Sequence, residues 1–159
     1  PVSLSSRAPG RQLAQGALHR GTAKTWYGID MATQRALVVD DSDVLRRLIE
    51  MCLRPAGFEV AAAASGAEAL EKVSSFEPNL VILDIGLPDM TGWEVLTALR
   101  ATEAGAEAKV MVLSGYEDAK IEAKDRGADA SLVKPFRNDE LRSLAIDLAG
   151  PRLSEASPA

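Results

Sequence analysis

The sequence has almost none of the residues that build disulfide frameworks and transition-metal centres. Its 159 residues contain one cysteine, Cys52, and one histidine, His19. A single cysteine excludes an internal disulfide and a cysteine-cluster site, and a single histidine excludes a multi-histidine zinc or iron site. We therefore expect Cys52 to be a small buried hydrophobe, and a reducing, cytoplasmic setting is the default interpretation.

Long hydrophobic runs are also missing. No apolar stretch approaches the roughly 20 residues that a membrane-spanning helix needs, and runs such as 60–64 are far shorter. The N-terminus lacks the apolar core of a secretory signal. The sequence thus predicts no insertion into a membrane.

The charge of the chain is divided unevenly. Residues 1–35 carry five basic residues and one acidic residue, a net charge of +4, whereas residues 36–159 carry 13 basic and 22 acidic residues, a net charge of −9. An acidic body argues against non-specific binding to nucleic acid, so we expect no direct nucleic-acid partner. The basic segment is interpreted as a solvated arm.

The pattern predicts one domain with two flanking segments. Residues 1–34 show no sustained periodicity and are interpreted as a linker, a tag remnant or a disordered arm, in which Met31 is a possible natural start. Residues 35–149 form the domain, and residues 150–159 are interpreted as a tail.

Within the domain, apolar runs alternate with segments of helical periodicity. The expected strands are 36–39, 58–63, 80–83, 110–113 and 130–133. The expected helices are 43–54, capped by Ser42, then 67–74, 93–101, 117–126 and 138–148. Continuous apolar strands indicate a parallel sheet buried between helices. Five such units favour an α/β, flavodoxin-like (βα)5 doubly wound sheet with strand order 2-1-3-4-5.

Polar residues stand where the predicted strands end. Asp40 and Asp41 follow the first strand, Asp84 the third, Ser114 the fourth and Lys134 the fifth. Ligands of open parallel sheets bind beyond the carboxyl ends of the strands. Three carboxylates beside one ammonium call for a cation, and oxygen-only ligands favour Mg²⁺ or Mn²⁺. A carboxylate can attack phosphorus, so the pattern predicts a phosphoryl-transfer site.

These motifs resemble the receiver domain of two-component response regulators over residues 35–149. The resemblance rests on four segments in order: Asp40-Asp41, the run LDIGLPDMTG from Leu83 to Gly92, Ser114-Gly115, and Gly127-Ala128-Asp129 leading to Lys134-Pro135-Phe136. It implies a phospho-accepting signalling switch, not an enzyme with a separate substrate. The phosphodonor would be a histidine kinase or a histidine phosphotransfer protein.

The resemblance also implies a metal-ligand set. Asp41 and Asp84 would bind Mg²⁺ or Mn²⁺ directly, and Asp40 would bind it mainly through water. The backbone carbonyl of Gly86 would be a third direct protein ligand.

The same resemblance gives roles to the residues around the phosphoryl group. Asp84 would be the phosphoacceptor, Ser114 would hydrogen-bond a phosphoryl oxygen, and Lys134 would pair with the phosphoryl group. The Lys134–Pro135 bond is typically cis in this family.

One position departs from the family pattern. Ser131 stands three residues before the lysine, where family members usually carry an aromatic side chain that rotates as the switch. Tyr116 and Gly86 occupy positions that tune access of water to the acyl phosphate. The family uses the face formed by helix 117–126, strand 130–133 and helix 138–148 for output, so we expect a downstream protein partner there.

The sequence leaves several readings open. The chain is either a stand-alone receiver or the C-terminal receiver of a hybrid histidine kinase. A phosphate-independent interaction module with the same fold is one alternative function. An Mg²⁺-dependent aspartyl-phosphate phosphohydrolase is a weaker one, because that class needs a second aspartate two residues after the nucleophile, where this chain has Gly86.

Overall fold

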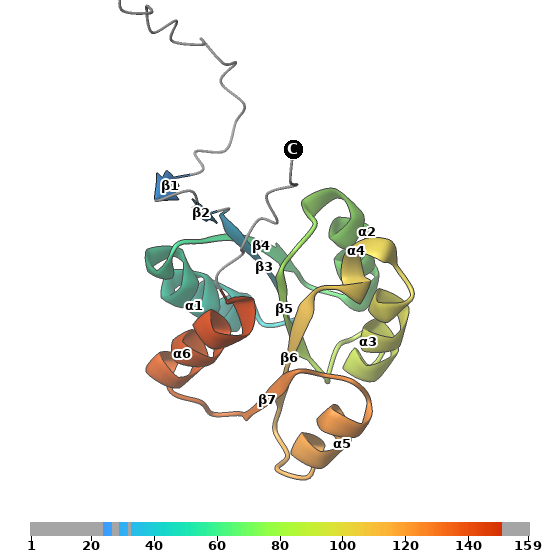
Figure 1. Cartoon of the computed structure of the whole chain (residues 1–159). Coiled ribbons are helices and arrows are strands. Elements are labelled where there is room, and N and C mark those ends of the chain that lie inside the picture. The colour runs from blue at the N-terminus through green and yellow to red at the C-terminus, as the bar shows by residue number, and fades with distance from the viewer. Residues whose placement is uncertain (1–23, 27–28, 32, 151–159) are drawn as a thin grey trace, which may run out of the picture.

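The computed structural model describes residues 24–26, 29–31 and 33–150. Its main body is a five-stranded sheet between two layers of helices (Figure 1). The strands of this sheet are β3 (Gln34–Val39), β4 (Phe58–Ala63), β5 (Leu80–Asp84), β6 (Lys109–Ser114) and β7 (Ala130–Val133). The helices are α1 (Asp43–Leu53), α2 (Gly66–Phe76), α3 (Gly92–Arg100), α4 (Glu103–Ala106), α5 (Ala119–Asp125) and α6 (Asn138–Ala149), and a 3₁₀ turn, η1, spans Arg54–Ala56.

The sheet confirms the predicted topology. All its neighbouring strands are parallel, in the order β4-β3-β5-β6-β7, which is 2-1-3-4-5 when the strands of the domain are counted along the chain. The strand order reverses between β3 and β5. The carboxyl ends of these two strands therefore border the switch point, where this class of sheet binds its ligands.

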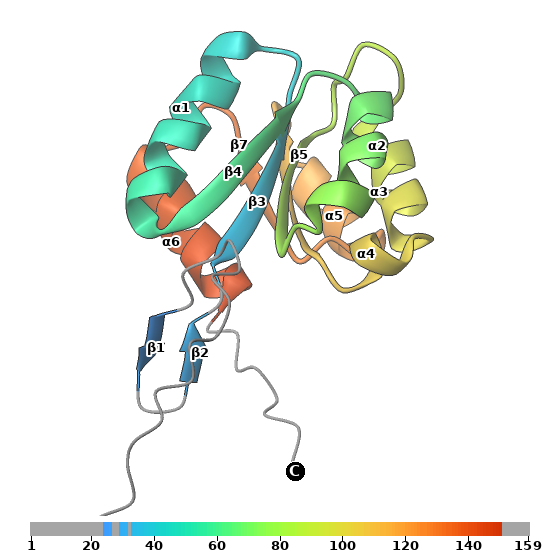
Figure 2. The same ribbon diagram turned by 90° about the horizontal axis from the view of Figure 1, so that it is seen from above.

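Each face of the sheet supports its own hydrophobic core, because successive side chains of a strand point to opposite faces. Leu37, Val39, Val81 and Leu83 are buried against the layer that contains α2, α3 and α5. The alternate residues of the same strands are buried against α1 and α6, together with Cys52, which confirms its expected burial. Figure 2 shows the two helical layers on either side of the sheet. Because helices pack on both faces of the sheet, the strand ends that carry the polar residues are held in fixed positions.

Three short elements were absent from the sequence prediction. Strands β1 (Lys24–Trp26) and β2 (Ile29–Met31) pair in antiparallel fashion outside the main sheet. The helix α4 (Glu103–Ala106) is capped by Thr102, whose side chain accepts a hydrogen bond from the Gly105 N–H. None of the helices in the described part of the chain is long and apolar enough to cross a bilayer.

The helix α5 is anchored more weakly than α1 and α3. It is seven residues long, only Ala119 and Ala123 of it are buried, and its Asp118 N-cap accepts no capping hydrogen bond from the described residues. By contrast, Ser42 caps α1 as predicted, and Thr91 and Glu94 form a reciprocal capping box on α3. The Arg126 guanidinium lies 5.1 Å from the ring centre of Trp93 and links the end of α5 to α3.

Candidate functional site

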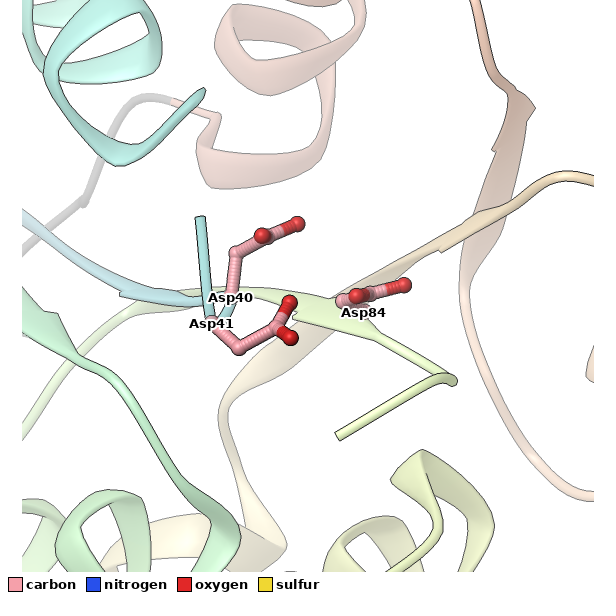
Figure 3. A group of neighbouring side chains, drawn as sticks. All are labelled: Asp40, Asp41 and Asp84. Carbon is pink, nitrogen blue, oxygen red and sulfur yellow. The ribbon is translucent and has the colours of Figure 1, made fainter. Parts of the chain in front are cut away.

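Three carboxylates meet beyond the ends of β3 and β5 (Figure 3). Carboxylate oxygens of Asp40, Asp41 and Asp84 all lie within 4.8 Å of one another. Asp40 is 1% exposed and Asp84 is 7% exposed, whereas Asp41 is open to solvent. The sheet topology produces this cluster, because Val39 pairs with Leu83 in adjacent parallel strands.

Lys134 supplies the positive charge of the cluster. Its Nζ lies 2.9 Å from Asp40 Oδ2 and 3.3 Å from Asp84 Oδ1. Burial disfavours the ammonium form, but the hydrogen bond to Asp40 and the charge of Asp84 outweigh it and raise the pKa of Lys134. The Lys134–Pro135 peptide bond is cis, as the resemblance predicts.

The electrostatic environment of Asp84 disfavours its ionised form. Burial raises the pKa of Asp84, and the charge of Asp40 raises it further. The Lys134 ammonium and the Gly86 N–H, which donates to Asp84 Oδ1 at 3.3 Å, act in the opposite direction. One ammonium facing three carboxylates leaves an excess of negative charge, which a divalent cation would relieve.

Backbone contacts hold Asp40 in place. Its N–H donates to the Ala63 carbonyl at 3.1 Å, and its Oδ1 accepts from the Ser42 N–H at 2.8 Å. The Arg46 guanidinium donates to the Asp40 carbonyl at 2.6 Å. The Asp40 backbone is therefore fixed from β4 and α1, and its carboxylate is oriented by the Ser42 N–H.

Ser114 and Gly86 lie at the same edge of the sheet. Ser114 is buried at the end of β6, next to β5, and its Oγ accepts a hydrogen bond from the Tyr116 N–H at 3.0 Å. The Tyr116 side chain is 79% exposed. Gly86 is exposed, and a Cβ added to it would stay 4.0 Å from Asp84 Oδ2, so the approach to Asp84 is open on this side.

A groove of about 620 Å³ lies between α5, β7 and α6. Its lining includes the small side chains of Ala123, Ala130 and Ser131. Ser131 is half-buried at the unpaired edge of the sheet. Ser131, which stands where family members usually carry an aromatic side chain, therefore lines an open groove.

Sequence reasoning gave no role to Asp89. This exposed carboxylate accepts hydrogen bonds from the N–H groups of Gly66 and Ala67, which lie 23 and 22 residues away in the chain. A contact between such distant segments leaves no periodic pattern in the sequence. The signal was the aspartate in the LPDMTG segment, whose partners only the fold identifies.

Comparison with known proteins places this geometry in a family. Residues 36–146 match the response regulator receiver domain. The transcriptional regulatory protein PrrA of Mycobacterium tuberculosis is 44% identical over 112 residues, which cover 70% of this chain and 48% of PrrA. The chain thus spans about half the length of this curated relative. PrrA is named a transcriptional regulator, so the absence of a nucleic-acid partner stays a prediction for this protein.

Solved structures agree with the sequence comparison. The chemotaxis response regulator CheY4 of Vibrio cholerae superposes with a TM-score of 0.69 at 33% identity, covering 74% of this chain and 99% of CheY4. The response regulator TrrA of Thermotoga maritima, solved in complex with Mg²⁺-BeF, gives a TM-score of 0.65 at 36% identity over 72% of this chain and 98% of TrrA. The chain belongs to the response regulator receiver domains, the signalling switches that pair with histidine kinases in two-component systems.

Proposed function

We propose that the protein is a switch controlled by phosphorylation of Asp84. The observation that carries this proposal is the convergence of three carboxylates within 4.8 Å, with the Lys134 ammonium 3.3 Å from Asp84. A histidine kinase or a histidine phosphotransfer protein would donate the phosphoryl group. Phosphorylation would change the surface of the domain, and the changed surface would bind a downstream protein.

The residues present fit a hard divalent cation. The cluster offers only oxygen ligands and carries an excess of negative charge, which suits Mg²⁺ or Mn²⁺. Asp41, Asp84 and the Gly86 carbonyl would hold the ion, with Asp40 bound mainly through water. When bound, the ion neutralises charge on the phosphoryl oxygens.

The transfer itself needs one nucleophile and one leaving group. An Asp84 carboxylate oxygen forms the new bond to phosphorus, and the bond from phosphorus to the histidine nitrogen of the donor breaks. The electron pair of that bond stays with the imidazole, which leaves. The Lys134 ammonium, 3.3 Å from Asp84 Oδ1, would offset the charge that builds up on the phosphoryl group. The later attack of water on phosphorus returns Asp84 and inorganic phosphate.

Phosphorylation with a small-molecule donor tests the proposal. Incubating the whole chain with acetyl phosphate and Mg²⁺ is expected to add the mass of one phosphoryl group, as measured by intact mass spectrometry. Chelation of the divalent cation with EDTA is expected to prevent the adduct. If neither acetyl phosphate nor the phosphate mimic beryllofluoride modifies or binds the protein, the phosphate-independent interaction module becomes the better interpretation.

We further propose that α5, β7 and α6 form the output face. The groove between them has lysines on its α5 side, Lys120 and Lys124, and acidic residues on its α6 side, Glu140 and Asp147. A partner would place a bulky apolar side chain over Ser131, an acidic group against α5 and a basic group against α6. The hollow that Ser131 leaves would thus be filled from outside the chain.

The weak anchoring of α5 predicts where phosphorylation acts. Addition of beryllofluoride and Mg²⁺ is expected to change the amide hydrogen exchange of residues 119–125 at least severalfold, because few buried contacts oppose a shift of this helix. The exchange of residues 70–76 of α2, beyond its first turn, serves as the internal control and is expected to stay unchanged. Equal effects on both helices would contradict a local switch at α5.

A further inference from the structure

We infer that Asp89 is a positioning residue for the phosphoryl-transfer site. Its carboxylate fastens the loop between β5 and α3, residues 85–91, to the first turn of α2, and in this way it holds Gly86 and Asp84 in the geometry that binds the cation. The inference rests on the function proposed above, since it concerns the same site.

Both oxygens of Asp89 are engaged by the start of α2. Oδ1 accepts from the Gly66 N–H and Oδ2 from the Ala67 N–H, each at 2.9 Å. The Ser65 hydroxyl accepts from the next N–H, that of Glu68. The first N–H groups of a helix have no partner within it, so Asp89 satisfies two of them from another segment. The bonds from Ala67 and Gly66 lower the pKa of Asp89, so its carboxylate is ionised at neutral pH.

Packing reinforces this contact at the neighbouring residue. Met90 lies so close to Gly66 that a Cβ added there would be 2.5 Å from Met90 Cγ and 2.7 Å from a methyl carbon of Val95. Two consecutive loop residues, Asp89 and Met90, thus grip the same end of α2. The tip of the loop is held at that end by hydrogen bonds and by close packing together.

The base of the loop is closed and lies against Asp84. Gly86 and Thr91 form an isolated antiparallel bridge, and the Gly92 N–H donates to the Ile85 carbonyl at 2.8 Å. A Cβ added to Gly92 would come within 2.4 Å of the Asp84 carbonyl oxygen. Because the loop is short and closed on itself, moving its tip at Asp89 also moves Gly86 at its base.

The first turn of α2 is in turn linked to the other half of the site. The segment before it contains Ala63, whose carbonyl accepts from the Asp40 N–H at 3.1 Å, and Ala64, whose N–H donates to the Glu68 carboxylate at 2.9 Å. Asp89 therefore completes a series of contacts that runs from the end of β3, through β4 and α2, to the end of β5. The pairing of β3 with β5 brings Asp40 and Asp84 together, and this series of contacts supports their placement from the other side, without Lys134.

The test compares two variants that remove caps from the same helix. Asp89→Ala removes the contact between the loop and α2, whereas Ser65→Ala removes a cap of α2 without touching the loop. Mn²⁺ affinity is measured on the whole chain by water-proton relaxation, and amide hydrogen exchange is measured at Gly92 without metal. Asp89→Ala is expected to weaken Mn²⁺ binding about tenfold, as residues that orient metal ligands do, and to accelerate exchange at Gly92.

The control variants separate positioning from simple stabilisation. Ser65→Ala is expected to lower the melting temperature while Mn²⁺ affinity and Gly92 exchange stay at the wild-type values. Asp89→Asn keeps one acceptor oxygen, so its Mn²⁺ affinity is expected to lie between those of wild type and Asp89→Ala. Wild-type Mn²⁺ affinity in Asp89→Ala, or equal losses of Mn²⁺ affinity in Asp89→Ala and Ser65→Ala, would overturn this inference but not the proposed function. Absence of Mn²⁺ binding by the wild type would overturn the proposed function as well.

Discussion

Replacing Asp84 with asparagine is expected to abolish the phosphoryl adduct that acetyl phosphate and Mg²⁺ produce. Asparagine has nearly the same size as aspartate, but it lacks the charged oxygen that must form the bond to phosphorus. Asp40 does not compensate, because its carboxylate is held by Lys134 and by the Ser42 N–H. Intact mass spectrometry measures the result directly.

A neighbouring aspartate provides the matched control for this experiment. Asp43 lies in the first turn of α1, and its carboxylate is exposed and paired with Arg46. Asp43→Asn changes the charge near the site by the same amount, and we expect it to form the adduct as the wild type does. An adduct of unchanged yield on Asp84→Asn would show that another residue accepts the phosphoryl group.

Asp84→Asn is also expected to stabilise the folded protein when no divalent cation is bound. The folded-state pKa of Asp84 lies above the unfolded value of 3.8, so the folded protein holds this proton more tightly. The stability that this carboxyl contributes is present at low pH and is lost as the pH rises through its folded-state pKa. At neutral pH, Asp84→Asn removes that loss, and denaturant unfolding should show a gain of about 1 kcal/mol, within the usual range of single stabilising substitutions. Below pH 3.8 the gain should vanish.

The sequence was sufficient to predict the sheet, because burial determines its strands. Strands β4 and β7 coincide with the predicted ranges, since each is a mostly apolar segment, interrupted only by Glu59 and Ser131, between turn residues. Alternation of strands with helices then permits few topologies. The short elements had no such signal: α4 has four residues and no apolar stripe, and β1 and β2 have three residues each.

Some features of the site could likewise be predicted from the sequence, and others could not. The residues at the strand ends could be predicted because a parallel sheet brings the carboxyl ends of its strands to one edge. The specific pairing of Lys134 with Asp40 could not, because these residues are 94 positions apart and Asp84 lies within reach of the same ammonium. Side-chain rotamers and local packing decide between such partners, and neither has a periodic signature in the chain.

Lys134→Met is expected to be the most destabilising substitution at the site when no divalent cation is bound. The ammonium joins the end of β7 to the carboxylates of two other strands, and Asp40 is 1% exposed. Removing one partner of a buried ion pair costs roughly 3–5 kcal/mol. The Lys134 side chain is 28% exposed, so water reduces the cost, and we expect a loss of about 2 kcal/mol in denaturant unfolding at neutral pH.

The pH dependence identifies the charge as the cause. The folded-state pKa of Lys134 is raised above its usual 10.5, so its contribution to stability is full below pH 10.5 and is lost as the pH rises through the folded-state value. The difference between the wild type and Lys134→Met should therefore shrink at strongly alkaline pH. It should also shrink in acid, where the unpaired carboxylates take up protons.

A surface ion pair and a divalent cation provide the controls for Lys134→Met. Lys72 lies 2.7 Å from Glu68, and both side chains are 40% exposed, so Lys72→Met is expected to cost at most about 1 kcal/mol. Mg²⁺ is expected to restore part of the stability of Lys134→Met, because it would supply positive charge to the same carboxylates. Equal losses in the two lysine variants, or no response of Lys134→Met to Mg²⁺, would mean that Lys134 acts through packing and not through its charge.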